Sequence, residues 1–140
     1  MKTRAIIVSG YFNPLHKWHI EYYHLAKQKG DKLFVIVNSD YHRELKKSKE
    51  FMSEQERLLI VNELAVTDKT ILSIDKDRTV CLSLKKIYED YSNIYELHFA
   101  NVGDQNNLSI PESLVCRNLG IGLIEGLGKK IQSSSWLLKK

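Results

Sequence analysis

The stretch that decides the fold is AIIVSGYFNPLHKWHIEYYHLAKQKG, residues 5–30. It begins with a short apolar run, breaks into a turn at Gly10, and continues as a helical pattern of apolar residues. A strand, a glycine turn and a helix in this order predict the first half of a β–α–β unit. His16 and His19 stand where the helix begins, and their spacing places both imidazoles on one face of its first turn.

Length and composition favour one soluble globular domain spanning residues 1–140. Hydrophobic residues make up 43% of the chain and charged residues 27%, which argues against disorder and against a disulfide scaffold. The formal net charge of +4 suits small anionic molecules as well as nucleic acid, so charge alone does not choose between these partners. The two cysteines, Cys81 and Cys116, lie far apart in the sequence, and we expect both to be small core residues.

Hydropathy predicts neither a membrane span nor a signal peptide. No apolar segment approaches the roughly 20 residues that a transmembrane helix needs, and the first residues, MKTRAIIVSG, turn polar early. We therefore expect a cytoplasmic protein with no membrane partner.

Alternation of apolar runs with helical patterns predicts an α/β protein, a Rossmann-like three-layer α/β/α domain with a five-stranded parallel sheet. The expected strands are residues 4–8, 33–38, 70–74, 96–100 and 122–125. In such sheets, ligands bind at the carboxyl ends of the strands, near the point where the strand order reverses.

Helices are expected over residues 18–29, from residue 54 onward, over 79–91 and 111–119, with a last short one near 133–135. Ser53 and Glu56 form a capping box at the start of the second of these helices. We expect its buried stripe to consist of Leu58, Leu59, Ile60 and Leu64.

The turn at Gly10 and the helix that follows it are suited to binding a phosphate. Glycine permits close approach of the backbone, and a helix start offers free N–H groups to an anion. His16 and His19 would each donate a hydrogen bond to the same phosphoryl group. A zinc site needs further ligands that the sequence does not show, whereas two solvated surface histidines remain the simpler alternative.

The segment GYFNPLHKWH resembles the first signature of the nucleotidyltransferase superfamily, G-x-F-[DN]-x-x-H-x-G-H. Residues 132–138, QSSSWLL, are similar to its second signature, I-S-S-T-x-x-R. Between them, residues 46–68 resemble the lysine-bearing loop and helix of the small cytidylyltransferases that act on glycerol phosphate, and residues 101–104 resemble their Gly-Asp turn. The likeness spans nearly the whole chain.

This resemblance implies transfer of a nucleotidyl group from a nucleoside triphosphate to a phosphorylated small-molecule acceptor, with release of pyrophosphate. It favours CTP as donor and an alcohol or sugar phosphate such as glycerol 3-phosphate as acceptor. An adenylyltransferase using ATP is the alternative, because Asn-Pro in the first signature is commoner among adenylyltransferases that make dinucleotides. The resemblance also implies a homodimer.

The site residues follow from the same resemblance. His16, His19 and Lys46 would be catalytic, as donors of hydrogen bonds and charge to the phosphates. The expected nucleotide-binding residues are Gly10, Tyr11, Phe12, Asn13, Gly103, Asp104, Lys130, Ser133, Ser134 and Ser135. Mg²⁺ would be held mainly by the nucleotide phosphates and water, with no dedicated metal site in the protein.

Two departures from the family pattern keep other functions open. Trp18 replaces the glycine between the two histidines, and Leu138 replaces the arginine of the second signature. A nucleotide-binding module that has lost catalysis is therefore an alternative. A nucleic-acid binder is another, although no basic-aromatic ladder supports it. Arg57 matches a family arginine, or equally is a surface residue paired with Glu54.

Overall fold

The structure is a computed structural model that describes residues 3–10, 17–39, 53–76, 79–102 and 110–127. For residues 18, 19, 101, 102, 110 and 125–127 it describes the backbone only. The expected helix near residues 133–135 lies outside the described residues.

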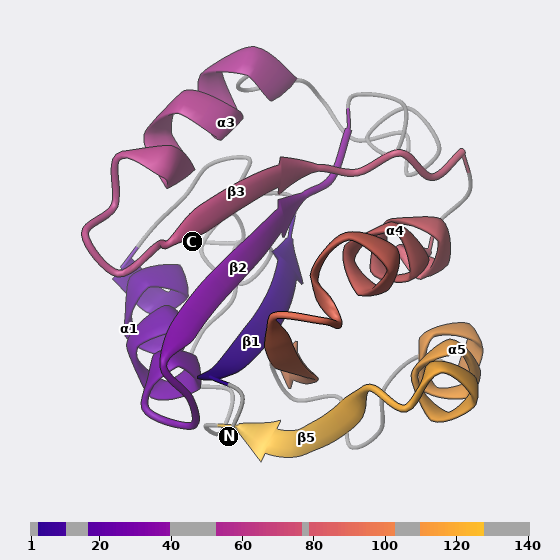
Figure 1. Ribbon diagram of the computed structural model, residues 1–140. Helices are drawn as coiled ribbons and strands as arrows, with labels where there is room; N and C mark the ends of the chain where they lie inside the picture. The colour runs from indigo at the N-terminus through magenta and orange to yellow at the C-terminus, as the bar shows by residue number, and fades with distance from the viewer. Residues whose placement is uncertain (1–2, 11–16, 40–52, 77–78, 103–109, 128–140) are drawn as a thin grey trace.

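Five parallel strands form one sheet in the order β3-β2-β1-β4-β5 (Figure 1). Their bounds are β1 Thr3–Gly10, β2 Lys32–Val37, β3 Lys69–Leu72, β4 Tyr95–Val102 and β5 Gly122–Leu127. The prediction of five parallel strands is confirmed. The central strands β1 and β2 are continuous apolar runs because helices cover both of their faces.

Two pairs of helices cover the sheet, one pair on each face (Figure 1). Their bounds are α1 Lys17–Lys27, α3 Glu54–Asn62, α4 Cys81–Tyr91 and α5 Ile110–Leu119. Side chains of α1 and α3 pack with alternate residues of β1 and β2 in one core, whereas α4 and α5 pack against the other face. The fold is thus a Rossmann-like three-layer α/β/α sandwich, as the sequence predicts.

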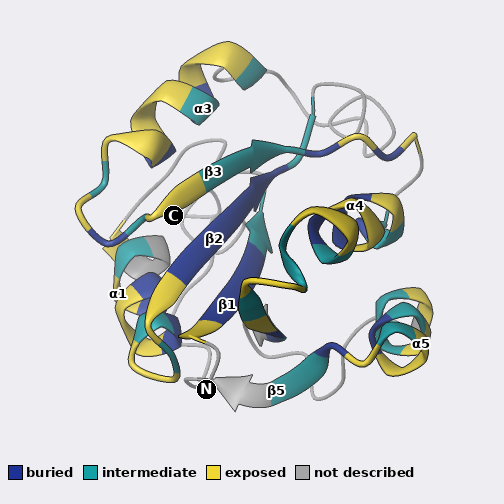
Figure 2. Cartoon of the chain, viewed as in Figure 1, coloured by how far each residue is buried: buried dark blue, intermediate teal, exposed yellow. Residues whose placement is uncertain are grey.

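The central strands β1 and β2 are buried along most of their length (Figure 2). Ile6 and Val8 of β1 point into the core under α1 and α3, and Ala5 and Ile7 point into the core under α4 and α5. All four side chains are inaccessible to solvent. This alternation explains why a strand of period two appears in the sequence as an uninterrupted apolar run.

Helix α3 differs from the expected pattern in its buried stripe. Leu59 is 63% exposed and Ile60 39% exposed, so the prediction that both lie in the core is wrong. The buried residues of α3 are Arg57 and Val61, one turn apart, with Leu58 and Leu64 partly buried at the edge of the core. The helix is rotated so that an arginine takes a core-facing position.

The caps of the helices largely follow the sequence. Ser53 accepts a hydrogen bond from the N–H of Glu56, so the predicted capping box is confirmed. Gly120, directly after α5, has a φ of 84°, a left-handed conformation that glycine adopts without steric cost.

Cys116 is buried, whereas Cys81 is only partly buried, so the expectation that both cysteines lie in the core holds for Cys116 alone. Among the described residues, no helix has the length and apolarity required to span a membrane.

Candidate functional site

The strand order reverses between β1 and β4, which pair directly at the centre of the sheet. Connections from β1 run to one side, toward β2 and β3, and connections from β4 run to the other, toward β5. Gly10 is the last residue of β1 and Val102 the last of β4. The first signature and the Gly-Asp turn follow these two residues in the sequence, so both begin at the switch point where ligands of open α/β sheets bind.

Helix starts at this carboxyl edge are potential anion sites, but the chain itself caps two of them. The N-terminus of α3 is capped by Ser53. The N-terminus of α4 is capped by Asp75, whose carboxylate accepts hydrogen bonds from the N–H groups of Leu82 at 2.8 Å and Ser83 at 2.9 Å. The helices that directly follow the switch-point strands are α1 and α5.

Asp75 is fully buried and belongs to a compact polar network at the end of β3. Its carboxylate also accepts a hydrogen bond of 2.6 Å from the hydroxyl of Ser83, and its own N–H donates to the hydroxyl oxygen of Ser73. The bonds to Leu82 and Ser83 tie the end of β3 to the first turn of α4, and the bond to Ser73 stays within the segment that follows β3. The network therefore stabilises the crossover and uses the positive end of the α4 dipole internally.

Arg57 lies beneath the carboxyl end of β2 and is 1% exposed. Its guanidinium Nη1 donates a hydrogen bond to the backbone oxygen of Asn38, at 2.5 Å. The N–H of Asn38 in turn donates to the backbone oxygen of Gly10, at 2.9 Å. Of the two alternatives for Arg57, the position on a solvated face is wrong, because α3 turns this residue toward the sheet.

The structure describes two of the residues expected to form the site. Gly10 is partly buried at the end of β1, and the backbone of His19 lies in the first turn of α1, directly beyond the first signature. The other expected site residues lie outside the described residues: Tyr11, Phe12, Asn13, His16, Lys46, Gly103, Asp104, Lys130, Ser133, Ser134 and Ser135. Their convergence on one cavity stays a prediction.

A groove of about 890 Å³ lies at the opposite, amino edge of the sheet. It is lined by Arg4, Lys29, Asp31, Tyr95 and Glu96 among others. These residues precede or begin the strands, so the groove is remote from the segments that follow Gly10 and Val102. Its size does not make it the nucleotide site, because both signature segments leave the sheet at the other edge.

Charged side chains at the amino edge pair with one another. The Nε of Arg4 donates to Glu96 at 2.8 Å, and the Nε2 of His98 lies 3.2 Å from the same carboxylate without the alignment of a hydrogen bond. Hydrogen bonding by Arg4 and attraction by His98 hold the pKa of Glu96 below its usual value. The edge is therefore a set of internally balanced ion pairs.

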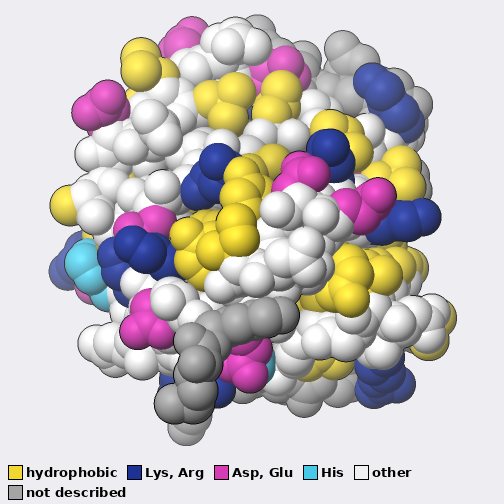
Figure 3. Space-filling model, in the orientation of Figure 1, with side chains coloured by type: hydrophobic (Ala, Val, Ile, Leu, Met, Phe, Trp, Pro, Cys, Tyr) yellow, Lys and Arg dark blue, Asp and Glu magenta, His cyan; other side chains and the backbone are white. Residues whose placement is uncertain are grey.

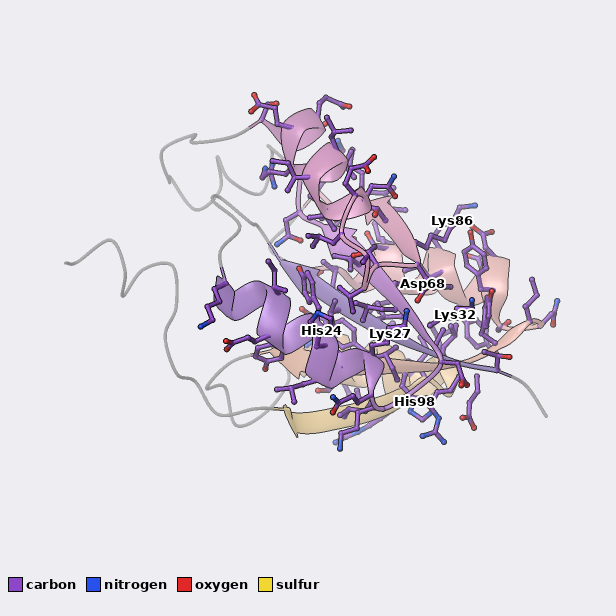
Figure 4. The ribbon with its side chains drawn as sticks, turned by 90° about the vertical axis from the view of Figure 1, so that its left-hand side faces the viewer. His24, Lys27, Lys32, Asp68, Lys86 and His98 are labelled. Carbon is purple, nitrogen blue, oxygen red and sulfur yellow. The ribbon has the colours of Figure 1, made fainter. Side chains whose placement is uncertain are left out.

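A second ion pair joins the end of α1 to the start of β3. Lys27 and Asp68 lie side by side in Figure 4, with their charged atoms 3.0 Å apart. Partial burial of Asp68 opposes ionisation, but the N–H of Leu33 and the Lys27 ammonium lower the pKa of its carboxyl below the ordinary value. The pair connects two crossovers of the fold.

Charges of both signs are mixed on the face of the molecule that Figure 3 shows. On the face drawn in Figure 3, Lys and Arg side chains are interspersed with Asp and Glu and form no continuous basic stripe. Within the described ranges, no cluster of three or more His, Cys, Asp or Glu side chains is placed to bind a metal ion.

Sequence reasoning missed two residues that shape this edge, Asp75 and Asn38. No sequence motif marks Asp75 as a helix cap, because its partner Ser83 is brought close only by the connection from β3 to α4. Asn38 acts through its backbone, which leaves no trace in residue type. One signal was available for Arg57: its spacing of four residues from Val61 places it on the core-facing side of α3.

Comparison with known families agrees with this geometry. Residues 7–110 match the family model described as cytidylyltransferase-like. The match covers more than half of the chain and includes the end of β1, the first signature, the whole of α3 and the whole of β4. The chain belongs to the cytidylyltransferase-like family of nucleotidyltransferases.

Several of the curated relatives are named FAD synthase. The enzyme of Methanosarcina barkeri is 42% identical over 72 residues, which are 51% of this chain and 51% of that protein. The enzyme of Picrophilus torridus is 30% identical over 120 residues, 83% of this chain and 77% of its own length. The chain thus spans about half the length of the first of these relatives and about three quarters of the second.

A solved structure supports the same fold. The lipopolysaccharide core biosynthesis protein from Thermoplasma volcanium superposes with a TM-score of 0.67 and 25% sequence identity, over 94% of this chain and 98% of that one.

Proposed function

We propose that this chain is an adenylyltransferase that transfers AMP from ATP to FMN. The observation that carries the proposal is the similarity to proteins named FAD synthase in Methanosarcina barkeri and Picrophilus torridus. The Asn13-Pro14 pair supports the same donor, since it is commoner in adenylyltransferases that make dinucleotides. The proposal replaces CTP, which the sequence alone favours, with ATP.

In this reaction a phosphate oxygen of FMN attacks the α-phosphorus of ATP. The bond from that phosphorus to the oxygen bridging the α- and β-phosphates breaks, and pyrophosphate leaves with the electron pair. No covalent enzyme intermediate is needed, so the protein contributes orientation and stabilises the charge that grows on the α-phosphate oxygens.

Within this proposal, His16 and His19 donate hydrogen bonds to the α-phosphate, and Lys46 neutralises the triphosphate. The amides and hydroxyls of Ser133 to Ser135, with Lys130, hold the β- and γ-phosphates. The turn at Gly103 and Asp104 offers backbone groups to the base or ribose. Mg²⁺, held mainly by the phosphate oxygens and water, would supply further neutralisation of their charge.

A homodimer is proposed on family resemblance, and light scattering after gel filtration tests it.

A second candidate is cytidylyl transfer from CTP to a sugar or polyol phosphate. Two observations favour it: the cytidylyltransferase-like family match, and the similarity to a Thermoplasma volcanium structure described as a lipopolysaccharide core biosynthesis protein. The two candidates share the same phosphate chemistry and differ only in the base and the acceptor.

The deciding experiment incubates the protein with each of the four nucleoside triphosphates and with FMN, glycerol 3-phosphate or a hexose phosphate. Pyrophosphate release is measured, and the product is identified by chromatography. We expect FAD from ATP and FMN alone, with no pyrophosphate when the acceptor is omitted. A cytidylyl product would assign the second candidate. Nucleotide binding without pyrophosphate release from any combination of triphosphate and acceptor would identify a module that has lost catalysis. Trp18→Gly, which restores the residue of the family pattern, would then be the first substitution to test.

A further inference from the structure

Arg57 occupies a buried position at which an apolar side chain would cost less free energy of desolvation. Together with Val61 it forms the core-facing side of α3, and among the described residues it has the largest of the fully buried side chains. A guanidinium does not lose its charge inside a protein, so burying it is tolerated only when hydrogen bonds replace the lost hydration. The acceptors of its N–H groups therefore indicate its role.

Hydrogen bonds connect Arg57 to the ends of two strands. Its Nη1 donates to the backbone oxygen of Asn38, the residue directly after β2. The N–H of Asn38 donates to the backbone oxygen of Gly10, the last residue of β1. The buried side chain of Arg57 is thus linked to Gly10, the first residue of the first signature, through the backbone of one residue, Asn38.

This connection runs through the backbone of Asn38. The side-chain Oδ1 of Asn38 is buried and has no hydrogen-bond partner in the described part of the chain. The neighbouring ladder bond, from the N–H of Ser73 to the oxygen of Val37, belongs to the pairing of β2 with β3 and does not involve Arg57. The amide of Asn38 bonds to β1 and lies next to the bond from Arg57, whereas the amide of Ser73 bonds only to Val37 of β2. Loss of the Arg57 bond should therefore affect the Asn38 amide first, and the Ser73 amide serves as the reference.

We propose that Arg57 is a positioning residue that fixes the points at which the chain leaves β1 and β2, and thereby sets nucleotide affinity without contact to the nucleotide. The proposal builds on the proposed function, because it assumes that the segment following Gly10 binds phosphate. A shift of about 1 Å at the base of a phosphate-binding turn misplaces every donor beyond it, which costs both binding and rate.

The variants are Arg57→Met, Arg57→Lys and the control Val61→Ala. Methionine keeps most of the length of the side chain but removes all donors. Lysine retains a charge and one donor for the oxygen of Asn38 but lacks the planar fork. Val61→Ala opens a small cavity on the same side of the same helix, so it lowers the melting temperature without touching Asn38.

Two quantities are measured for each variant: the dissociation constant for ATP, by equilibrium binding, and hydrogen exchange of the Asn38 and Ser73 amides, by NMR. In Arg57→Met we expect about tenfold weaker ATP binding and faster exchange at Asn38 than at Ser73. Arg57→Lys should recover part of both effects. Val61→Ala should bind ATP within about twofold of wild type and change both amides equally.

Equal loss of ATP affinity in Arg57→Met and Val61→Ala would overturn the proposal, since it would show that general destabilisation is the cause. Unchanged relative exchange at Asn38 would overturn it as well. If the unmodified protein binds neither ATP nor CTP, the proposed function fails, while the exchange of the Asn38 amide still decides whether Arg57 positions the strand ends. Arg57→Lys provides the same two measurements if Arg57→Met does not fold.

Discussion

The two edges of the sheet use charge in opposite ways. At the amino edge, Arg4 pairs with Glu96, and Lys27 pairs with Asp68. At the carboxyl edge, the buried Arg57 donates to a backbone oxygen and the buried Asp75 accepts from backbone N–H groups. The charged pairs at the amino edge therefore balance one another, whereas the two buried charges at the carboxyl edge hold the backbone at strand ends and at a helix start.

This difference is a stronger argument for a site at the carboxyl edge than the shape of the surface is for a site at the amino edge. The groove at the amino edge is large, but the charged groups Arg4 and Glu96 in its wall already satisfy each other. A site that must bind a triphosphate needs donors held in place before the ligand arrives. Rigid strand ends tied to a buried cation supply such a base, and exposed ion pairs do not.

The largest expected effect separates the two ends of a single helix. His19 lies in the first turn of α1, at the carboxyl edge, and His24 lies exposed in its last turn. We expect His19→Ala to lower kcat about 100- to 1000-fold, the usual cost of removing one donor to a developing charge. His24→Ala should leave kcat within about twofold. Steady-state pyrophosphate release measures both, and equal effects of the two substitutions would remove the histidine from the mechanism.

The next effect is on stability and compares Asp75, the buried carboxylate that caps the N-terminus of α4, with an exposed carboxylate in the last turn of α4. Asp75→Ala leaves two N–H groups of the α4 N-terminus and the hydroxyl of Ser83 without their acceptor. We expect a loss of about 2–4 kcal/mol in the free energy of unfolding. Asp90→Ala removes an exposed pairing with Lys86 and should cost no more than about 0.5 kcal/mol. Urea denaturation measures both, and a small effect of Asp75→Ala would show that water replaces its bonds.

The sheet and the helices were predictable because their signals are local. Apolar runs mark the strands, and Ser53 with Glu56 marks a helix start by hydrogen bonds that span three residues. The strand order β3-β2-β1-β4-β5 was not predicted, because apolar runs do not show which strands pair. The boundaries differ by one or two residues, for example in β1, where the ladder extends to Gly10.

The roles of Arg57 and Leu59 were not predictable from residue type. A charged residue suggests a solvated face and a leucine a buried one, but the rotation of α3 about its axis is set by how it packs on β2 and β3. The catalytic residues remain those that the family resemblance implies, since only Gly10 and the backbone of His19 are described at the site. The sequence therefore predicts a functional carboxyl edge, which stays a prediction, and it did not show how the backbone of that edge is held.

A smaller effect tests whether the amino edge is as tightly packed as its ion pairs suggest. A Cβ atom on Gly122 of β5 would overlap the imidazole of His98 on β4, so Gly122→Ala requires the ring to move. We expect a loss of about 1–3 kcal/mol, typical of overpacking. His98→Ala in the same chain should recover most of it, because it removes the overlapping ring. Thermal unfolding of the two single variants and the double variant gives the coupling, and additive losses would place the strain elsewhere.

The smallest effect concerns the pH dependence of the amino-edge pair Lys27–Asp68. Because the pKa of Asp68 is lower in the folded state, its contribution is complete above the unfolded pKa of about 3.9 and is lost as pH falls through the folded value. Asp68→Asn should therefore cost roughly 1 kcal/mol near pH 7, and progressively less below pH ~4. Urea midpoints of both proteins between pH 3 and pH 8 measure the difference. A gap that stays constant across this range would mean that the hydrogen bond to the N–H of Leu33, and not the charge of Asp68, stabilises this corner of the fold.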